Sequence, residues 1–176
     1  MKLSENKIAH SFDYYRFEEL PNFLLYKALK LRSDIFVVEQ NCVYPDLDDK
    51  DVHTETLHLL LQDDLAAGTN NGACSSSNVI AYARCLAPGV SFPGSSIGRV
   101  AVTGTARGSG VAKLLMLQAM SLCKQHWPDQ NIQIGAQLYL QNFYTQLGFI
   151  PCSEAYDEDG IMHIDMELQD LSKSLS

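Results

Sequence analysis

The segment from Ser96 to Leu122 constrains the fold more than any other part of the chain. Ser96–Val102 is apolar and β-branched, as expected of a buried strand, and a loop with glycines at 104, 108 and 110 follows it. From Val111 onward, apolar residues recur at helical spacing until Pro128, which cannot continue a helix. A strand that passes through such a loop into a helix presents free backbone N–H groups at the positive end of a helix dipole. The segment therefore predicts an α/β fold with an anion-binding loop.

Two common nucleotide-binding motifs are excluded at this loop. The P-loop requires G-x-x-x-x-G-K-[ST], and Lys113 does not complete that pattern. The dinucleotide fingerprint requires G-x-G-x-x-G, whereas Gly108-Ser109-Gly110 is followed by Val, Ala and Lys. The loop therefore belongs to another class of phosphate-binding site.

The rest of the chain predicts one mixed α/β domain over residues 11–170, between a flexible leader at 1–10 and a tail at 171–176. The predicted order is β-α-β-β-β-α-β-α-β-β. The Gly-, Asn- and Ser-rich stretch 66–78 predicts a flexible connection, and residues 44–51 form an acidic loop. The other strands are predicted at 12–17, 58–61, 79–86, 131–136, from 149, and at 162–168, and the other helices after Pro21 and at 138–147.

Charge and composition restrict the partners of the protein. A net charge of −8 argues against a nucleic-acid-binding face. No apolar stretch reaches the length of a membrane span, and the polar first residues predict no signal peptide. The five cysteines are scattered and form no C-x-x-C pair, which predicts reduced thiols and a cytoplasmic location.

Arg107, Gly110 and Ala112 match the pattern R-x-x-G-x-A. This pattern resembles the acetyl-coenzyme A signature of the GNAT N-acetyltransferases. The segment Gln137–Phe149, in which Tyr144 precedes Gly148-Phe149, is similar to the C-terminal helix of that family. The likeness covers residues 12–168 and is strongest to the ElaA branch of the family. It is carried by the segments 31–42, 58–59, 81–84, 97–100, 135–137 and 158–161.

The resemblance implies a mixed, mostly antiparallel sheet, splayed near its middle, with helices on both faces. It also implies acetyl-CoA as the cosubstrate, held between the strands at 97–103 and 131–136, and no metal. Tyr144 is the implied general acid for the leaving thiolate. Glu39 is the candidate base for the amine, or alternatively an exposed carboxylate at a helix end. The cofactor-binding residues would be Val100, Ala101, Val102, Arg107, Gly108, Ser109, Gly110, Val111, Ala112 and Gln137.

The acceptor amine is expected to enter from the opposite side, bordered by residues 36–51. The aspartates of the acidic loop are expected to be solvated, or to form a negative rim that attracts a cationic amine; the glycine of a calcium-binding EF-hand loop is missing at Asp51. Arginines in apolar surroundings need partners, here either Glu39, the acidic loop or a substrate carboxylate. His58 could also be a satisfied buried histidine. The candidate acceptor-side residues are Phe36, Tyr44, His58, Arg84 and Arg99.

The acceptor itself is expected to be a small-molecule or peptide amine, and the protein could form a homodimer. Three alternatives remain open from the sequence, and one is that the acceptor is a protein lysine or N-terminus. The region from Arg32 to Phe36 resembles the acyl-homoserine-lactone synthases, which share the fold and transfer other acyl groups. The domain could also bind coenzyme A as a sensor without catalysing a transfer.

Overall fold

A computed structural model of the protein describes residues 10–63 and 78–168, so the predicted connection at 66–77, the tail at 171–176 and residues 1–9 of the predicted leader lie outside the described residues. The elements in chain order are β1 His10–Tyr15, η1 Phe17–Glu19, α1 Asn22–Arg32, η2 Ser33–Glu39, β2 Leu57–Asp63, β3 Asn78–Leu86, β4 Ser95–Val102, η3 Gly104–Ala106, α2 Val111–His126, β5 Ile132–Gln137, η4 Leu138–Leu140, α3 Gln141–Thr145, β6 Ile150–Pro151, β7 Tyr156–Glu158 and β8 Ile161–Leu168.

The strands form one eight-stranded sheet in the order β1-β2-β3-β4-β5-β8-β6, with β7 also paired to β8. Neighbouring strands are antiparallel except β4 and β5, which run parallel. This central parallel pair is joined through α2, as a parallel connection requires a crossover. The expected fold, a mixed and mostly antiparallel sheet with helices on both faces, is confirmed.

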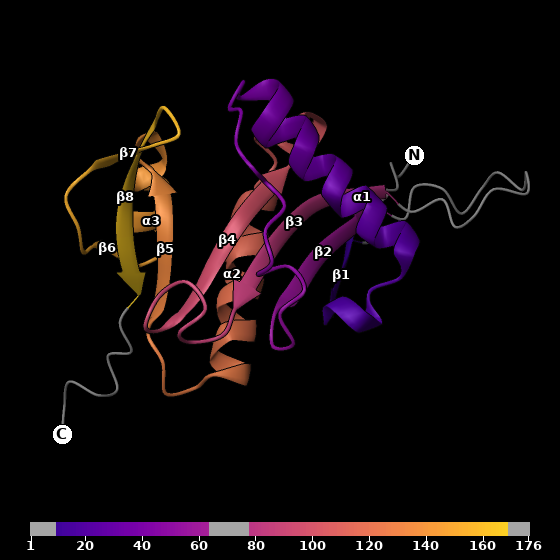
Figure 1. The fold of residues 1–176 in the computed structure, drawn as a ribbon, viewed down its shortest axis with the longest axis horizontal. Coiled ribbons are helices and arrows are strands. Elements are labelled where there is room, and N and C mark those ends of the chain that lie inside the picture. The colour runs from indigo at the N-terminus through magenta and orange to yellow at the C-terminus, as the bar shows by residue number, and fades with distance from the viewer. Residues whose placement is uncertain (1–9, 64–77, 169–176) are drawn as a thin grey trace, which may run out of the picture.

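Helices cover the two faces of the sheet, with α1 in front and α2 behind in Figure 1. Alternate residues of the central strands face opposite sides. On β2, Leu59 and Leu61 pack toward α2, while Leu60 packs toward α1. The sheet therefore separates two hydrophobic cores, and both faces of its central strands are buried.

Local boundaries differ from the sequence prediction at several elements; Asn78, for example, is predicted in the 66–78 connection but begins β3. Two differences change the type of element. Strand β1 occupies 10–15 rather than 12–17, because Phe17–Glu19 turns into a short 3-10 helix, and His10 belongs to β1 rather than to the leader. The predicted helix 138–147 is broken into η4 and α3, since Leu140 adopts a non-helical conformation (φ −95°, ψ 1°). Gly148, at φ 97°, ends this region as expected of a helix C-terminus.

Candidate active site

The edge of β4 that faces β5 opens after its second residue. β4 pairs with β5 only at Ser95–Ile132 and Ser96–Gln133, whereas β3 pairs along its other edge up to Val102. Figure 1 shows the two strands diverging toward their C-terminal ends. Residues 98–100 are half-buried there, between buried neighbours on both sides. An opened strand edge offers backbone N–H and C=O groups to an extended ligand.

A β-bulge lies on the same stretch of β4. Tyr82 opposes Ala101 and Arg84 opposes Gly98, so two residues of β4 face one residue of β3. Arg99 has the left-handed backbone angle φ 52°, which is unusual for a residue other than glycine. Val100 and Val102 pack toward α2, and Ala101 and Arg99 lie on the α1 side, as the alternation of the strand predicted.

The loop after β4 holds the predicted cofactor-binding residues at the start of the 16-residue helix α2. Gly108 (φ 76°) and Gly110 (φ 87°) both adopt left-handed conformations, and an added Cβ at either position would meet nothing within 4 Å. The strand therefore reaches the helix through a turn that only glycine adopts without strain. The first N–H groups of α2 have no partner within the helix, which leaves them available to an anion.

Arg107 and Glu39 form a two-pronged ion pair. Nη1 of Arg107 donates to Oε1 of Glu39 (2.6 Å) and Nη2 donates to Oε2 (3.0 Å). Nε of Arg107 donates to the carbonyl oxygen of Val102 (3.2 Å). The hydrogen bond from Arg107, with its charge, lowers the pKa of the Glu39 carboxyl group. Glu39, the candidate base, is therefore bonded to the candidate phosphate-binding arginine, and this pairing makes its carboxylate less basic.

Gln137 ends β5 on the opposite wall of the opening. Its amide donates to Oε1 of Gln40 (3.0 Å), and the amide of Gln40 donates in return (3.4 Å). The hydroxyl of Tyr139 also donates to Gln137 (2.6 Å). Gln40 was not among the residues singled out from the sequence, since its partner is far away along the chain.

Tyr144 lies on α3, beyond β5. Its side chain is 7% exposed, with edge-to-face contacts to the rings of Phe143 and Phe149. Burial, with a smaller contribution from Tyr139, raises the pKa of Tyr144 to about 12. The hydroxyl therefore keeps its proton at neutral pH, as a proton donor must.

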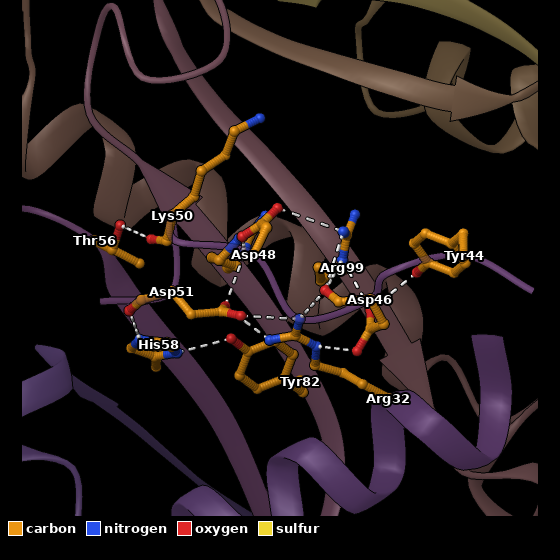
Figure 2. Close-up of polar contacts among 11 residues, drawn as sticks. Arg32, Tyr44, Asp46, Asp48, Lys50, Asp51, Thr56, His58, Tyr82 and Arg99 are labelled. Atoms are coloured by element: carbon orange, nitrogen blue, oxygen red, sulfur yellow. Dashed lines mark hydrogen bonds and ion pairs between the residues drawn. The ribbon is translucent and has the colours of Figure 1, made fainter. Parts of the chain in front are cut away.

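Tyr44, His58 and Arg99, three of the predicted acceptor-side residues, lie around the acidic loop in Figure 2, and Arg84 bonds to the same loop. Asp51 accepts hydrogen bonds from Arg32 (2.8 and 3.1 Å) and Arg84 (2.7 Å). Asp46 pairs with Arg32 (3.0 Å) and Arg99 (2.9 Å). Asp46 and Asp51 are buried, so the expectation of a solvated loop or a free negative rim is wrong for them. Of the alternatives left open for the arginines, the acidic loop is their partner.

Charge pairing overcomes desolvation in this ionic network of Arg32, Arg84, Arg99, Asp46, Asp48 and Asp51. Burial alone would raise the pKa of Asp51, but the hydrogen bond from Arg32 and the charge of Arg84 lower it. Burial likewise opposes the charged form of Arg84, yet its bonds to Asp48 and Asp51 raise its pKa. The charged forms of Asp51 and Arg84 are therefore favoured, and ion pairs hold the loop to α1, β3 and β4.

His58 and Tyr82 are buried beside the network and are hydrogen-bonded to each other. His58 is 1% exposed, and its Nε2 lies 2.9 Å from the carbonyl oxygen of Asp51, which can only accept. Burial lowers the pKa of His58, so the ring is neutral and its Nδ1 accepts from the Tyr82 hydroxyl at 2.8 Å. Both ring nitrogens are thus engaged within the fold.

Tyr44 and Phe36 complete the acceptor-side set. The hydroxyl of Tyr44 donates to Asp46 (2.9 Å), and the guanidinium of Arg99 lies 5.2 Å from the centre of its ring. Phe36 lies on η2 and packs against the core under α1. Both side chains are half-buried, as is that of Arg99, so these three are the acceptor-side candidates whose surfaces are partly open.

Neither a metal-ligand group nor a membrane-spanning helix is found among the described residues. Over residues 10–63 and 78–168, no three His, Cys, Asp or Glu side chains are grouped so as to hold a metal ion. In the same ranges, no helix has the length and apolar character needed to cross a membrane.

Comparison with known proteins identifies the class that this fold and opened strand edge define. Residues 73–169 match the model of the acetyltransferase (GNAT) domain. The chain belongs to the GNAT acetyltransferase family, whose members are acyl-transfer enzymes that use an acyl-CoA cosubstrate.

Within this family the chain is ElaA-like. It is 43% identical to protein ElaA of Escherichia coli over 148 residues, which is 84% of this chain and 89% of ElaA. The crystal structure of E. coli ElaA superposes with a TM-score of 0.78 at 38% identity, over 92% of this chain and 100% of that one.

Two further solved structures bear on the alternatives. An acyl-CoA N-acyltransferase from Pseudomonas aeruginosa superposes with a TM-score of 0.78 at 32% identity, over 92% of this chain and 100% of that one. The CoA-dependent acyl-homoserine lactone synthase BjaI superposes with a TM-score of 0.66 at 16% identity, over 95% of this chain and 87% of that one. At that identity the second likeness shows a shared fold and nothing about the acyl donor or acceptor.

Proposed function

We propose that the protein is an N-acetyltransferase that moves the acetyl group of acetyl-CoA to a primary amine by direct attack. The observation that carries the proposal is the opened edge of β4, which ends at a glycine-turned helix N-terminus. An extended pantetheine arm fits such an edge, and a pyrophosphate fits the N–H groups at its end. One of the similar solved structures is named an acyl-CoA N-acyltransferase, from P. aeruginosa, and that name agrees with this class of activity.

In the proposed arrangement, the backbone of Val100, Ala101 and Val102 pairs with the pantetheine arm. The loop Arg107–Ala112 holds the pyrophosphate, and Gln137 lies beside the arm on the opposite wall. Positioning of donor and acceptor supplies much of the rate, since it turns an encounter in solution into a reaction between held groups.

The chemistry requires one bond to form and one to break. The neutral amine nitrogen attacks the thioester carbonyl carbon, the new C–N bond forms, and the C–S bond breaks as the electron pair leaves on sulfur. Tyr144, protonated at neutral pH, donates its proton to the departing thiolate. The amine proton passes to solvent or to a base, for which Glu39 stays the predicted group in the form freed from Arg107.

The acceptor and the compartment are part of the same proposal. The acceptor is a small-molecule or peptide amine that approaches between Phe36 and Tyr44, on the α1 side of β4. Cys42, Cys85, Cys123 and Cys152 are free thiols, which fits a cytoplasmic enzyme.

Release of free CoA from acetyl-CoA, measured with a panel of primary amines, tests the proposal. Tyr144→Phe is expected to lower kcat by on the order of 10²-fold with little change in the affinity for acetyl-CoA. Tyr26→Phe, which removes the hydroxyl of an exposed tyrosine on α1, is the matched control. Wild-type kcat in Tyr144→Phe would remove the acid role.

The same assay separates two of the alternatives. Turnover with longer acyl donors, on coenzyme A or acyl carrier protein, but not with acetyl-CoA would favour a synthase-like acyl transfer. Binding of acetyl-CoA with no transfer to any amine, and no effect of Tyr144→Phe, would favour a sensor.

A further inference from the structure

Four consecutive residues, Glu39–Cys42, lie across the opening between β4 and β5, and we call them the strap. Glu39 bonds to Arg107 after β4, and Gln40 bonds to Gln137 at the end of β5. The thiol of Cys42 lies 3.4 Å from the carbonyl oxygen of Asp159, in the turn between β7 and β8. The strap thus contacts both walls of the opening.

The contacts of the strap hold Glu39 in place independently of Arg107. Gln40, next to Glu39, makes a reciprocal amide pair with β5, and Asn41 follows in a left-handed conformation (φ 51°). Cys42 is buried. The backbone next to Glu39 is therefore held from its C-terminal side, which keeps the carboxylate within reach of Arg107.

The guanidinium of Arg107 is paired with the carboxylate of Glu39. The guanidinium has five N–H donors, and three of its nitrogens each make a bond here, two of them to Glu39 and one to Val102. The side chains of Arg107 and Glu39 are 45% and 50% exposed, so solvent and a phosphate can both reach the pair. The carboxylate holds the position that a phosphate oxygen would take on the same fork.

We propose that Glu39 is an ionic latch on the cofactor loop, which competes with the pyrophosphate of acyl-CoA for Arg107 and so sets the affinity for the cosubstrate. The inference rests on the proposed function, because it requires acyl-CoA to bind at this loop. Glu39 acts on the cosubstrate through Arg107, so in this role it is a positioning residue rather than a catalytic one. Cosubstrate binding opens the latch and leaves the Glu39 carboxylate unpaired beside the strap.

The latch predicts that removing the charge of Glu39 tightens binding. Exposed ion pairs are weak, so Glu39→Gln is expected to lower the Kd for acetyl-CoA by about two- to fivefold. A general loss of negative charge near an anionic ligand would also tighten binding. The two causes, release of Arg107 and reduced repulsion, differ because only the first requires Arg107 to be present. A double-mutant cycle measures that dependence.

The experiment is calorimetric titration of acetyl-CoA into the wild type, Glu39→Gln, Arg107→Gln and the double variant. Glu18→Gln, which removes one exposed charge on η1, is the matched control and should leave the Kd unchanged. S-acetylpantetheine, which lacks phosphates, is the second probe. The latch predicts a gain from Glu39→Gln only with acetyl-CoA and only when Arg107 is present.

The titrations distinguish failure of the latch from failure of the proposed function. A gain that persists in the Arg107→Gln background would mean charge repulsion alone and would overturn the latch, as would an unchanged or raised Kd in Glu39→Gln. If the wild type binds neither probe, the proposed function fails and the latch with it. If the wild type binds acetyl-CoA and Glu39→Gln binds it no more tightly, the proposed function stands and only the latch is overturned.

Discussion

Arg99 in β4 and Gly110 after it both have left-handed backbone conformations, which they maintain in different ways. Arg99, at φ 52°, is kept in the bulge by its ion pairs to Asp46 and Asp48 and by the ring of Tyr44. Gly110, at φ 87°, needs no such support, because glycine adopts this region freely. Strain at Arg99 is therefore offset by contacts, whereas at Gly110 it is avoided by the choice of residue.

Gly110→Ala is expected to weaken acetyl-CoA binding at least about tenfold, because a Cβ at this φ costs ~1–2 kcal/mol and shifts the first N–H groups of α2. Gly104→Ala is the matched control, since Gly104 has no positive φ and open space around it. Titration calorimetry of both variants measures the difference. Equal affinity in the two would show that the pyrophosphate does not bind at the start of α2. Gly110→Val should abolish binding with the fold intact.

His58 predicts a pH dependence of stability. Burial lowers the pKa of His58 in the folded protein below the ordinary value of 6.5. Below about pH 6.5 the unfolded chain therefore binds more protons at this residue than the folded chain does. Stability should therefore fall as the pH drops below about 6.5, with a slope of up to ~1.4 kcal/mol per pH unit. Urea unfolding between pH 7.5 and 5.5 should show a flatter profile for His58→Gln than for the wild type. His53→Gln, an exposed histidine, should keep the wild-type slope.

At the scale of elements, the acidic loop is held in place by ion pairs although it has no regular secondary structure. Residues 40–56 contain no helix or strand, yet the loop is fixed by charge to three elements: Arg32 ends α1, Arg84 lies on β3 and Arg99 on β4. Asp51 contributes most, since it bonds to two arginines that are almost fully buried. A buried charge without a partner is costly, so losing one member of the network would destabilise the loop.

Asp51→Asn is expected to lower the free energy of unfolding by about 3–5 kcal/mol, because it leaves Arg32 and Arg84 short of a counter-charge inside the protein. Asp49→Asn in the same loop changes the net charge equally at an exposed position and should stay within about 0.5 kcal/mol of the wild type. Urea denaturation of the two variants measures both values. Similar stabilities would mean that the network contributes no net stability.

At the scale of the whole molecule, the sheet holds β4 in place and also leaves one edge of that strand open. Its two buried faces hold β4 rigid between α1 and α2, while the divergence from β5 leaves one edge open. The strap then joins the α1 side to β5 and to the β7–β8 turn across that opening. A ligand that fills the opening contacts both halves of the sheet, so it should stabilise the fold as a unit.

Acetyl-CoA at 100 times its Kd stabilises a folded protein by about 2.7 kcal/mol, which for a chain of this size is a rise in Tm of roughly 5–11 °C. A thermal melt with acetyl-CoA, and with NAD as the control, measures the shift. NAD should cause none, because the loop lacks the dinucleotide fingerprint. No shift with millimolar acetyl-CoA would contradict the placement of the cosubstrate.

The sequence alone determined the strand–loop–helix junction and the order of the main elements. Apolar periodicity, the glycines at 108 and 110 and the stop at Pro128 act within a few residues, so their structural meaning can be read locally. The family likeness of the same segments pointed to the splay between β4 and β5, which the strand pairing confirms.

Only the tertiary structure decided which charges meet. Asp46 and Asp51 lie in a loop with the composition of a solvated segment, and their burial follows from arginines that lie 14 to 53 residues away in the chain. Glu39 and Arg107 are separated by 68 residues, and Gln40 and Gln137 by 97. Electrostatic partners are set by distance in space and by the local dielectric, neither of which sequence spacing encodes. The glycine loop before α2 was therefore predictable, and the contacts of the strap across the opening were not.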